Sequence, residues 1–73
     1  MYNFDKLIGL IIEKYGSKRK FAKDMNLSER SIYLKLMGKK EFKPTEIDRA
    51  CDLLNINECE IPKYFFSKKV QKN

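Results

Sequence analysis

The sequence has no histidine, and two cysteines, Cys51 and Cys59, are too few for a four-ligand zinc site. Without histidine there is no Cys/His pair for nucleophilic catalysis. The sequence also has neither a glycine-rich phosphate loop nor carboxylates clustered on one face. A chain of 73 residues is short for enclosing a deep substrate pocket. We therefore expect a protein that is not an enzyme and that binds neither metal nor cofactor.

Long apolar runs are also missing. No stretch approaches the roughly 20 apolar residues that a membrane-spanning helix needs, and the opening MYNFDK lacks the basic-then-apolar order of a signal peptide. Three glycines, two prolines and 42% hydrophobic residues are typical of a folded chain rather than a disordered one. We expect a single cytoplasmic domain with no membrane partner.

The positive charge lies in one segment. Residues 17–43 hold nine basic and three acidic residues, which accounts for the whole net charge of +6. A run of charge is often only a solvated face. Because the entire excess lies in one part of a small domain, it favours a polyanionic partner.

The first third of the chain predicts two helices. Asn3 can cap the first and Gly16 can end it in a left-handed conformation. Ser17 can cap the second, and Asn26 tolerates the positive φ that would end it. One apolar face of the first helix comprises Phe4, Leu7, Ile8, Ile11, Ile12 and Tyr15. The second helix would bury Phe21, Ala22 and Met25.

Two further helices follow. Ser28 caps a run from Glu29 to Met37 that stops at Gly38, with Ile32 and Leu36 four residues apart on its buried side. Pro44 and Thr45 can open a fourth helix, with Asp48 three residues after Thr45 as in a capping box. That helix would bury Ile47, Ala50, Cys51 and Leu54 and end at Asn55, and Asn57 would start one more short turn.

The C-terminal part is rich in apolar residues. They form too large an apolar load to leave in water, so they either cover the core or meet a second subunit or partner. This cluster comprises Ile61, Tyr64, Phe65 and Phe66. We expect Tyr2, Phe4 and Tyr15 in the core. The predicted domain spans residues 1–66, and residues 67–73 form a basic tail that frays.

Two short helices joined by a tight turn make the helix-turn-helix arrangement. The segment SKRKFAKDMNLSERSIYLKLMGKK resembles the helix-turn-helix of the Cro and lambda-type repressor family, with matches at Ala22, Leu27, Ser28, Ile32 and Gly38. Extended to MYNFDKLIGLIIEKYG and EIPKYFF, the chain most resembles a small uncharacterised phage protein group in that superfamily. The resemblance implies an all-α, compact five-helix lambda-repressor-like DNA-binding domain.

The resemblance also implies roles for individual residues. The third helix would enter the DNA major groove, where Arg30 can pair with guanine and Glu29 can accept from cytosine. The base-reading residues implied are Ser28, Glu29, Arg30, Tyr33 and Leu34. The phosphate-binding residues implied are Lys18, Arg19, Lys39, Lys40 and Lys43.

Two positions depart from the family pattern. Lys18 stands where the family usually has glutamine, and a lysine there can still contact phosphate. Lys35 stands where the family usually buries an apolar residue. We expect Leu36 to be buried and the stem of Lys35 to pack over the edge of the core.

The functional hypothesis is a sequence-specific regulator of double-stranded DNA, a Cro-like phage or prophage repressor acting in a bacterial cell. Members of the family commonly bind as dimers, so a homodimer formed in solution or on DNA is expected. The alternative is a protein-interaction module, an antirepressor or adaptor, that offers Tyr64, Phe65 and Phe66 to another protein.

Overall fold

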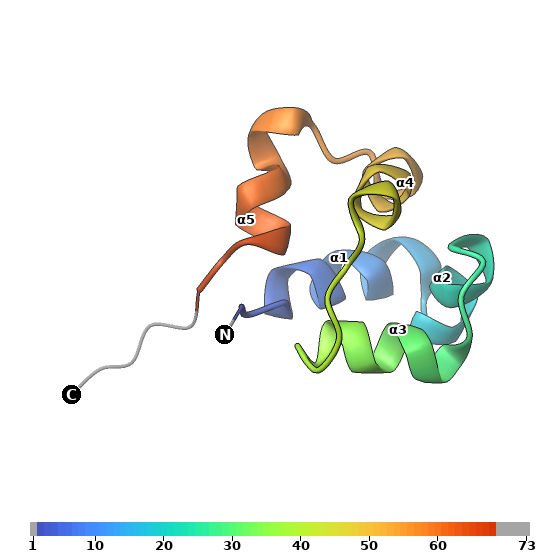
Figure 1. The fold of residues 1–73 in the computed structure, drawn as a ribbon. Helices are drawn as coiled ribbons and strands as arrows, with labels where there is room; N and C mark the ends of the chain where they lie inside the picture. The colour runs from blue at the N-terminus through green and yellow to red at the C-terminus, as the bar shows by residue number, and fades with distance from the viewer. Residues whose placement is uncertain (1, 69–73) are drawn as a thin grey trace.

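A computed structural model describes residues 2–68 of the chain. Its elements, in order, are α1 (Asp5–Tyr15), α2 (Lys18–Asp24), α3 (Glu29–Leu36), α4 (Pro44–Leu54), a single 3-10 turn η1 (Glu58–Glu60) and α5 (Ile61–Phe65) (Figure 1). Within residues 2–68 the only strand-like pairing is one antiparallel bridge between Tyr2 and Lys68. The prediction of an all-α domain with five helices is confirmed.

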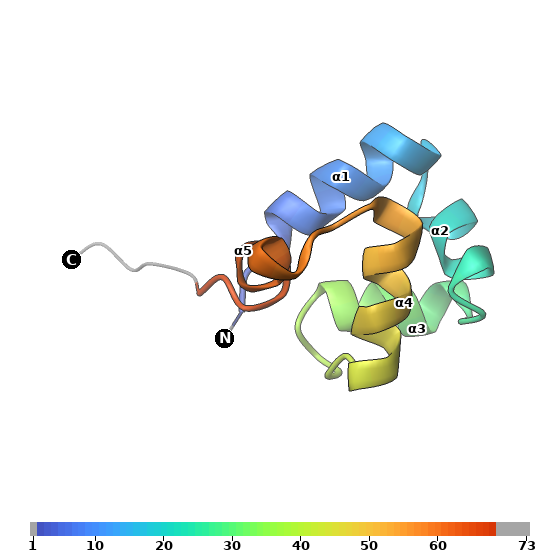
Figure 2. The same cartoon turned by 90° about the horizontal axis from the view of Figure 1, so that it is seen from above.

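The helices enclose one core. α1 contacts α2, α4 and α5, while α3 lies along one edge of the molecule beneath α4 (Figures 1 and 2). The largest fully buried side chains come from α1, α2, α3, α4 and α5, so every helix contributes at least one. They are Leu7, Ile11, Phe21, Ile32, Leu54 and Phe65. Because one face of α3 packs inward at Ile32, its opposite face is left on the surface.

Most helices end and begin where the sequence predicts. The exception at α1 is its cap, since Phe4 and not Asn3 is the residue before the helix, although Asn3 Oδ1 still accepts from the Asp5 N–H at 2.7 Å. A residue with left-handed φ follows each of the first four helices, and these residues are Gly16, Asn26, Gly38 and Asn55. At the helix starts, Ser17 Oγ accepts a hydrogen bond from the Lys20 N–H at 3.2 Å. Likewise, Ser28 Oγ accepts from the Ser31 N–H at 3.0 Å. The turn between α2 and α3 is therefore fixed by the left-handed φ of Asn26 at one end and by the Ser28 cap at the other.

The start of α4 differs from the prediction. The backbone N–H of Lys43 donates to Glu46 Oε1 at 2.9 Å, so Glu46 closes the capping interaction. The predicted pairing of Thr45 with Asp48 is wrong because Pro44 is already the first helical residue, which makes Glu46 the third. Glu46 is the residue that can reach back to the cap.

Two apolar residues expected to face the core lie at the surface. Ile12 is 45% exposed because it sits about 100° around the helix from the buried Ile11 and falls outside the inward stripe. Tyr2 is 43% exposed, at the end of the chain before α1 begins. Phe4 is buried and Tyr15 is half-buried. The prediction that these aromatic residues lie in the core is therefore wrong only for Tyr2.

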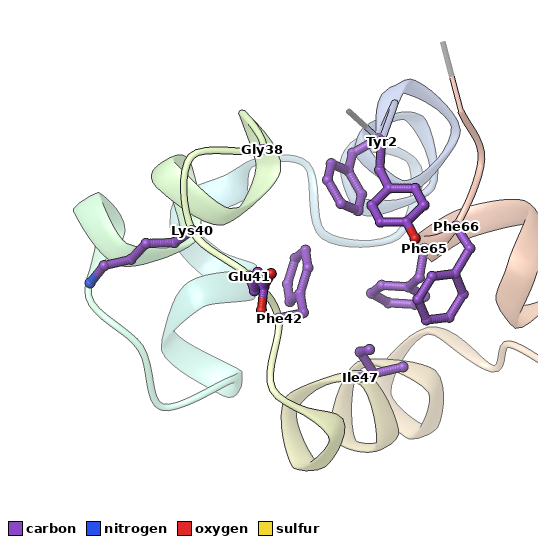
Figure 3. Close-up of a pocket in the computed structure, with 9 residues that line it drawn as sticks. Tyr2, Gly38, Lys40, Glu41, Phe42, Ile47, Phe65 and Phe66 are labelled. Carbon is purple, nitrogen blue, oxygen red and sulfur yellow. The ribbon is translucent and has the colours of Figure 1, made fainter. Parts of the chain in front are cut away.

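The two ends of the described segment, near Tyr2 and Lys68, meet beside α5. The Asn3 N–H donates to the Ser67 carbonyl at 2.6 Å, and the rings of Tyr2 and Phe66 meet edge to face with centroids 5.6 Å apart (Figure 3). Ser67 and Lys68, the first residues of the predicted frayed tail, are thus paired with the start of the chain. Residues 69–73 of that tail lie outside the described residues.

Candidate interaction surface

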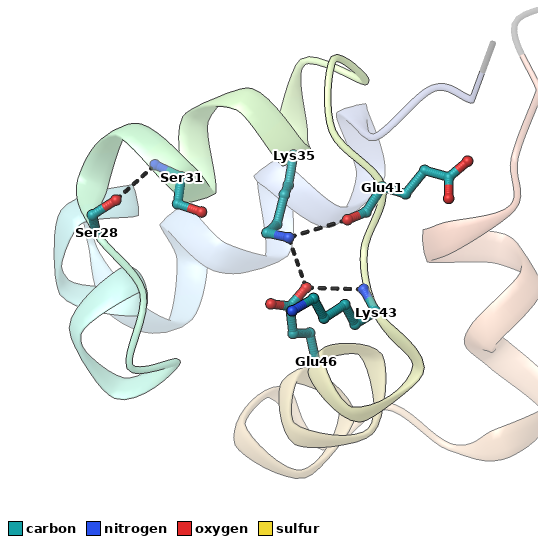
Figure 4. A network of polar contacts seen from close by, with 6 residues as sticks. All are labelled: Ser28, Ser31, Lys35, Glu41, Lys43 and Glu46. Atoms are coloured by element: carbon teal, nitrogen blue, oxygen red, sulfur yellow. Dashed lines mark hydrogen bonds and ion pairs between the residues drawn. The ribbon is translucent and has the colours of Figure 1, made fainter.

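An ion pair fixes α3 to the start of α4. Lys35 Nζ lies 2.8 Å from Glu46 Oε1 and donates to the Glu41 carbonyl at 3.1 Å (Figure 4). The sequence predicts the stem of Lys35 at the edge of the core and Leu36 buried, and both are observed. The sequence analysis did not identify the partner, Glu46, which lies eleven positions along the chain and meets Lys35 only after the loop folds back.

The environment of Glu46 favours its charged form. Burial alone would raise the pKa of its carboxyl group. The hydrogen bonds from Lys35 and from the Lys43 N–H, together with the charges of both lysines, outweigh burial and lower the pKa below its ordinary value. Glu46 therefore remains ionised at neutral pH, and its contact with Lys35 holds α3 at a fixed position against α4.

The outward side of α3 carries a stripe of largely apolar residues. Tyr33 is 48% exposed and Met37 is 46% exposed; Arg30 is exposed and Leu34 half-buried. Positions 30, 33, 34 and 37 follow the spacing of one helical face, opposite the buried Ile32 and Leu36. We call these four residues the α3 face.

The predicted base-reading residues all lie on or next to this helix. Ser28 caps it, and its hydroxyl is engaged with the Ser31 N–H. Glu29 Oε2 lies 3.9 Å from Arg19 Nε. The side chains of Glu29 and Arg19 are 69% and 83% exposed, so this ion pair is weak. Met37 was missed by the sequence analysis. Its spacing of four from Tyr33 and three from Leu34 was the signal that could have found it.

The predicted phosphate-binding residues lie in the segments on either side of α3 in the chain. Lys18 and Arg19 open α2, whereas Lys39, Lys40 and Lys43 lie in the loop that leaves α3. Lys18 is half-buried and the other four are exposed. Lys18 borders a shallow hollow that also touches Arg30 and Tyr33. Basic residues therefore lie in the segments before and after α3, and we call these five residues the basic rim.

The C-terminal aromatic cluster does not form one continuous surface. Phe65 is 2% exposed and belongs to the core, while Phe66 is 46% exposed. Ile61 and Tyr64 are half-buried and pack against the core. Of the residues predicted for a dimer or partner surface, only Phe66 is largely accessible, and it is joined there by Tyr2.

The structure also bears on membrane insertion and on metal binding. Among residues 2–68, no helix is long and apolar enough to cross a membrane. The same residues contain no group of three or more histidine, cysteine, aspartate or glutamate side chains that could hold a metal ion. Both observations apply to the described part of the chain.

The chain is similar to one protein family and to one solved phage protein. Residues 1–68 match the model of the family described as "Protein of unknown function (DUF739)". Among solved structures, the chain is similar to the modulator of repression (MOR) of the temperate bacteriophage TP901-1 from Lactococcus lactis. The two share 46% identity over 96% of this chain and 95% of that one, with a TM-score of 0.80. No curated protein sequence matches the chain.

These findings correct the main functional hypothesis. A DNA-binding Cro-like repressor is the wrong reading, because the similar phage protein is a modulator of repression. The apolar chemistry of the α3 face also fits protein binding better than base reading. Side chains that read bases mostly form hydrogen bonds, yet Tyr33, Leu34 and Met37 present mainly apolar surface. No finding tests the individual base and phosphate contacts, which stay predictions.

Proposed function

The chain belongs to the DUF739 family, and we propose that this protein modulates repression by binding a repressor protein. The likeness to the phage modulator supports the regulatory role, and 46% identity across nearly the whole of both chains makes a shared role reasonable. On this proposal the protein works inside a bacterial cell that carries the phage or prophage. The proposal corresponds to the interaction-module alternative. The surface that binds the partner is, however, the α3 face and not Tyr64, Phe65 and Phe66.

The observation that carries the proposal is the α3 face. The centres of protein–protein interfaces are enriched in tyrosine, methionine and arginine and depleted in lysine, which gathers at the rim. The α3 face has this anatomy: Tyr33, Met37 and Arg30 lie within one helical stripe, and lysines flank the helix at both ends. Exposed apolar side chains that lie next to one another, as Tyr33 and Met37 do one turn apart, favour a surface that a partner covers, unlike a single exposed residue such as Ile12.

The rigidity of α3 supports the same conclusion. The helix is capped at Ser28, anchored in the core through Ile32 and pinned by the Lys35–Glu46 pair. A surface held this way loses little conformational entropy when it binds. The basic rim would attract an acidic surface of the repressor and raise the association rate at low salt.

A binding titration tests the proposal. The protein is titrated by calorimetry into the purified repressor encoded in the same phage or prophage. We expect a saturable complex that Tyr33→Ala and Met37→Ala each weaken at least tenfold, because each removes a central apolar contact. The matched control is Ile12→Ala, which removes a similarly exposed apolar residue from α1 and should leave the affinity unchanged.

Circular dichroism must show that each variant is folded as the parent is. If the repressor does not bind, the proposal is wrong. If Tyr33→Ala and Met37→Ala both bind it with the parent's affinity, the α3 face is not the surface that binds it. Sequence-selective binding of the protein alone to operator DNA, without repressor binding, would also contradict it.

A further inference from the structure

A second surface feature shares no residue with the α3 face. A pocket of about 360 Å³ opens between the start of the chain, the loop that follows α3, α4 and α5. Its walls are mostly aromatic, and Figure 3 shows their rings gathered around one hollow. We call it the aromatic pocket; the residues that line it include Tyr2, Phe4, Phe42, Ile47, Phe65 and Phe66.

The rings of the pocket are held in place by one another. Phe42 meets Phe4 edge to face at 5.4 Å and Phe65 at 5.3 Å between ring centroids. On the other side, Tyr2 meets Phe66 at 5.6 Å. The two segments that carry this second pair are joined by the Asn3–Ser67 hydrogen bond. The pocket is therefore formed before any ligand arrives, as binding pockets usually are.

The outer wall is costly to leave in water. Tyr2 and Phe66 remain nearly half-exposed, although Phe4 and Phe65 beneath them already complete the core. The apolar area left on Tyr2 and Phe66 contributes to stability only when something covers it. A hollow of 360 Å³ lies at the lower end of the range for small ligand sites, roughly 300–1,000 Å³, so one large side chain can occupy it.

The charges near the pocket select the occupant. Lys40 and Glu41 both line the pocket. Lys39 precedes Lys40, Lys68 forms the backbone bridge with Tyr2, and both lysines are exposed. In Figure 3 the amine of Lys40 points away from the rings. Three lysines against one glutamate favour carboxylates at the rim, with apolar contact inside. A second copy of this chain fits poorly, since each copy carries a net charge of +6.

We propose that the aromatic pocket binds one bulky apolar side chain, leucine-sized or aromatic, presented by an acidic segment of a partner protein. The apolar side chain contacts Phe42, Phe66 and Tyr2, and the neighbouring carboxylates of the segment lie near Lys39, Lys40 and Lys68. This site adds a docking point that the proposed function does not require. Failure of the peptide to bind would leave repressor binding through the α3 face intact.

A peptide titration tests this site directly. The probe is the acetylated and amidated peptide Asp-Glu-Leu-Phe-Asp-Glu, added to the ¹⁵N-labelled full chain while amide shifts are recorded. We expect saturable shifts at Gly38, Lys40, Phe42 and Phe66, with a Kd of about 1 mM or tighter. A peptide with Ala-Ala in place of Leu-Phe should bind at least tenfold more weakly, and so should one with lysines in place of its acidic residues.

Variants of the protein locate the contact. Phe66→Ala and Tyr2→Ala should each weaken binding of the acidic peptide about tenfold, and Lys40→Gln should weaken it severalfold. All three residues are exposed, so the fold should persist. Ile12→Ala and Tyr33→Ala, which change exposed apolar residues elsewhere, should bind the peptide as the parent does.

Three results would overturn the proposal. The first is the absence of saturable shifts at millimolar peptide. The second is equal binding of the Ala-Ala peptide, which would reduce the interaction to charge. The third is tighter binding of a short oligothymidylate at the same amides, which would make the pocket a nucleic-acid stacking site instead.

Discussion

Lys35 Nζ lies 2.8 Å from Glu46 Oε1, and their side chains are only 6% and 14% exposed. Charges this poorly hydrated are costly unless their remaining hydrogen-bonding capacity is also used. Here the Glu41 carbonyl accepts from Lys35, and the Lys43 N–H donates to Glu46. The pair thereby ties the end of α3, the following loop and the first turn of α4 together.

Replacing Glu46 by glutamine should destabilise the protein. The amide keeps the shape of the side chain but leaves the buried Lys35 ammonium without an opposite charge. We expect the free energy of unfolding to fall by about 1–3 kcal/mol, since Lys35 still donates to the Glu41 carbonyl. Urea denaturation measures the change. The control Glu41→Gln alters an exposed carboxylate and should cost less than about 0.5 kcal/mol; equal losses in both variants would contradict the assignment.

The same pair predicts how stability depends on acid. The pKa of Glu46 is lower in the folded protein than its ordinary value of 4.5, so the stability that it contributes is fully present above that value. It should be lost as the pH falls below about 4.5 towards the folded pKa. Urea titrations between neutral pH and pH 3 measure this loss. Glu46→Gln should show a shallower decline than the parent, and parallel curves would argue against the pair as its source.

Two glycines should respond in opposite ways to alanine. Gly9 lies inside α1 and Gly16 ends it with φ +80, and an added Cβ at either position would meet no other part of the molecule within 4 Å beyond its chain neighbours and the α1 backbone. Gly9→Ala should stabilise by about 0.5–1 kcal/mol, because glycine loses more backbone entropy in a helix. Gly16→Ala should destabilise by about 1–2 kcal/mol from left-handed strain. Thermal unfolding followed by circular dichroism distinguishes the two signs.

Phe65, the last residue of α5, and Phe66, which follows it, should differ sharply in how much truncation lowers the free energy of unfolding. Phe65→Ala should cost about 3–5 kcal/mol, because it empties a core position. In a domain of this size that loss should leave much of the chain unfolded. Phe66→Ala should change the free energy of unfolding by about 0.5 kcal/mol or less. Helical circular dichroism at 25 °C compares them, and similar losses in both would mean that Phe66 is also part of the core.

The local signals of the sequence were reliable. Ser17 and Ser28 cap the helices that they were predicted to cap, and Gly16, Gly38 and Asn55 adopt the left-handed φ that ends a helix. Each of these choices depends on hydrogen bonds within three or four residues of the chain. At α4 the same local logic selected the wrong partner, since Asp48 was paired with Thr45 although Glu46 was in reach of Lys43.

The functional surface was harder to predict. The excess of lysine and arginine indicated an anionic partner, and DNA was taken as that partner. Long-range charge attraction is the same for a phosphate backbone and for an acidic protein surface. The apolar residues that separate the two possibilities were only partly recognised: Tyr33 and Leu34 were assigned to DNA, and Met37 was given no surface role.

The sequence by itself determined the helices, the serine caps of α2 and α3 and most of the buried stripe, because these follow from periodicity and from contacts between near neighbours. Only the tertiary structure decided that Lys35 meets Glu46, that Phe65 is buried while Phe66 is not, and that Tyr2 joins Phe66 in the wall of the aromatic pocket. The physical reason is the same in all three cases. Each depends on segments far apart in the chain, whose meeting is set by the packing of the whole core.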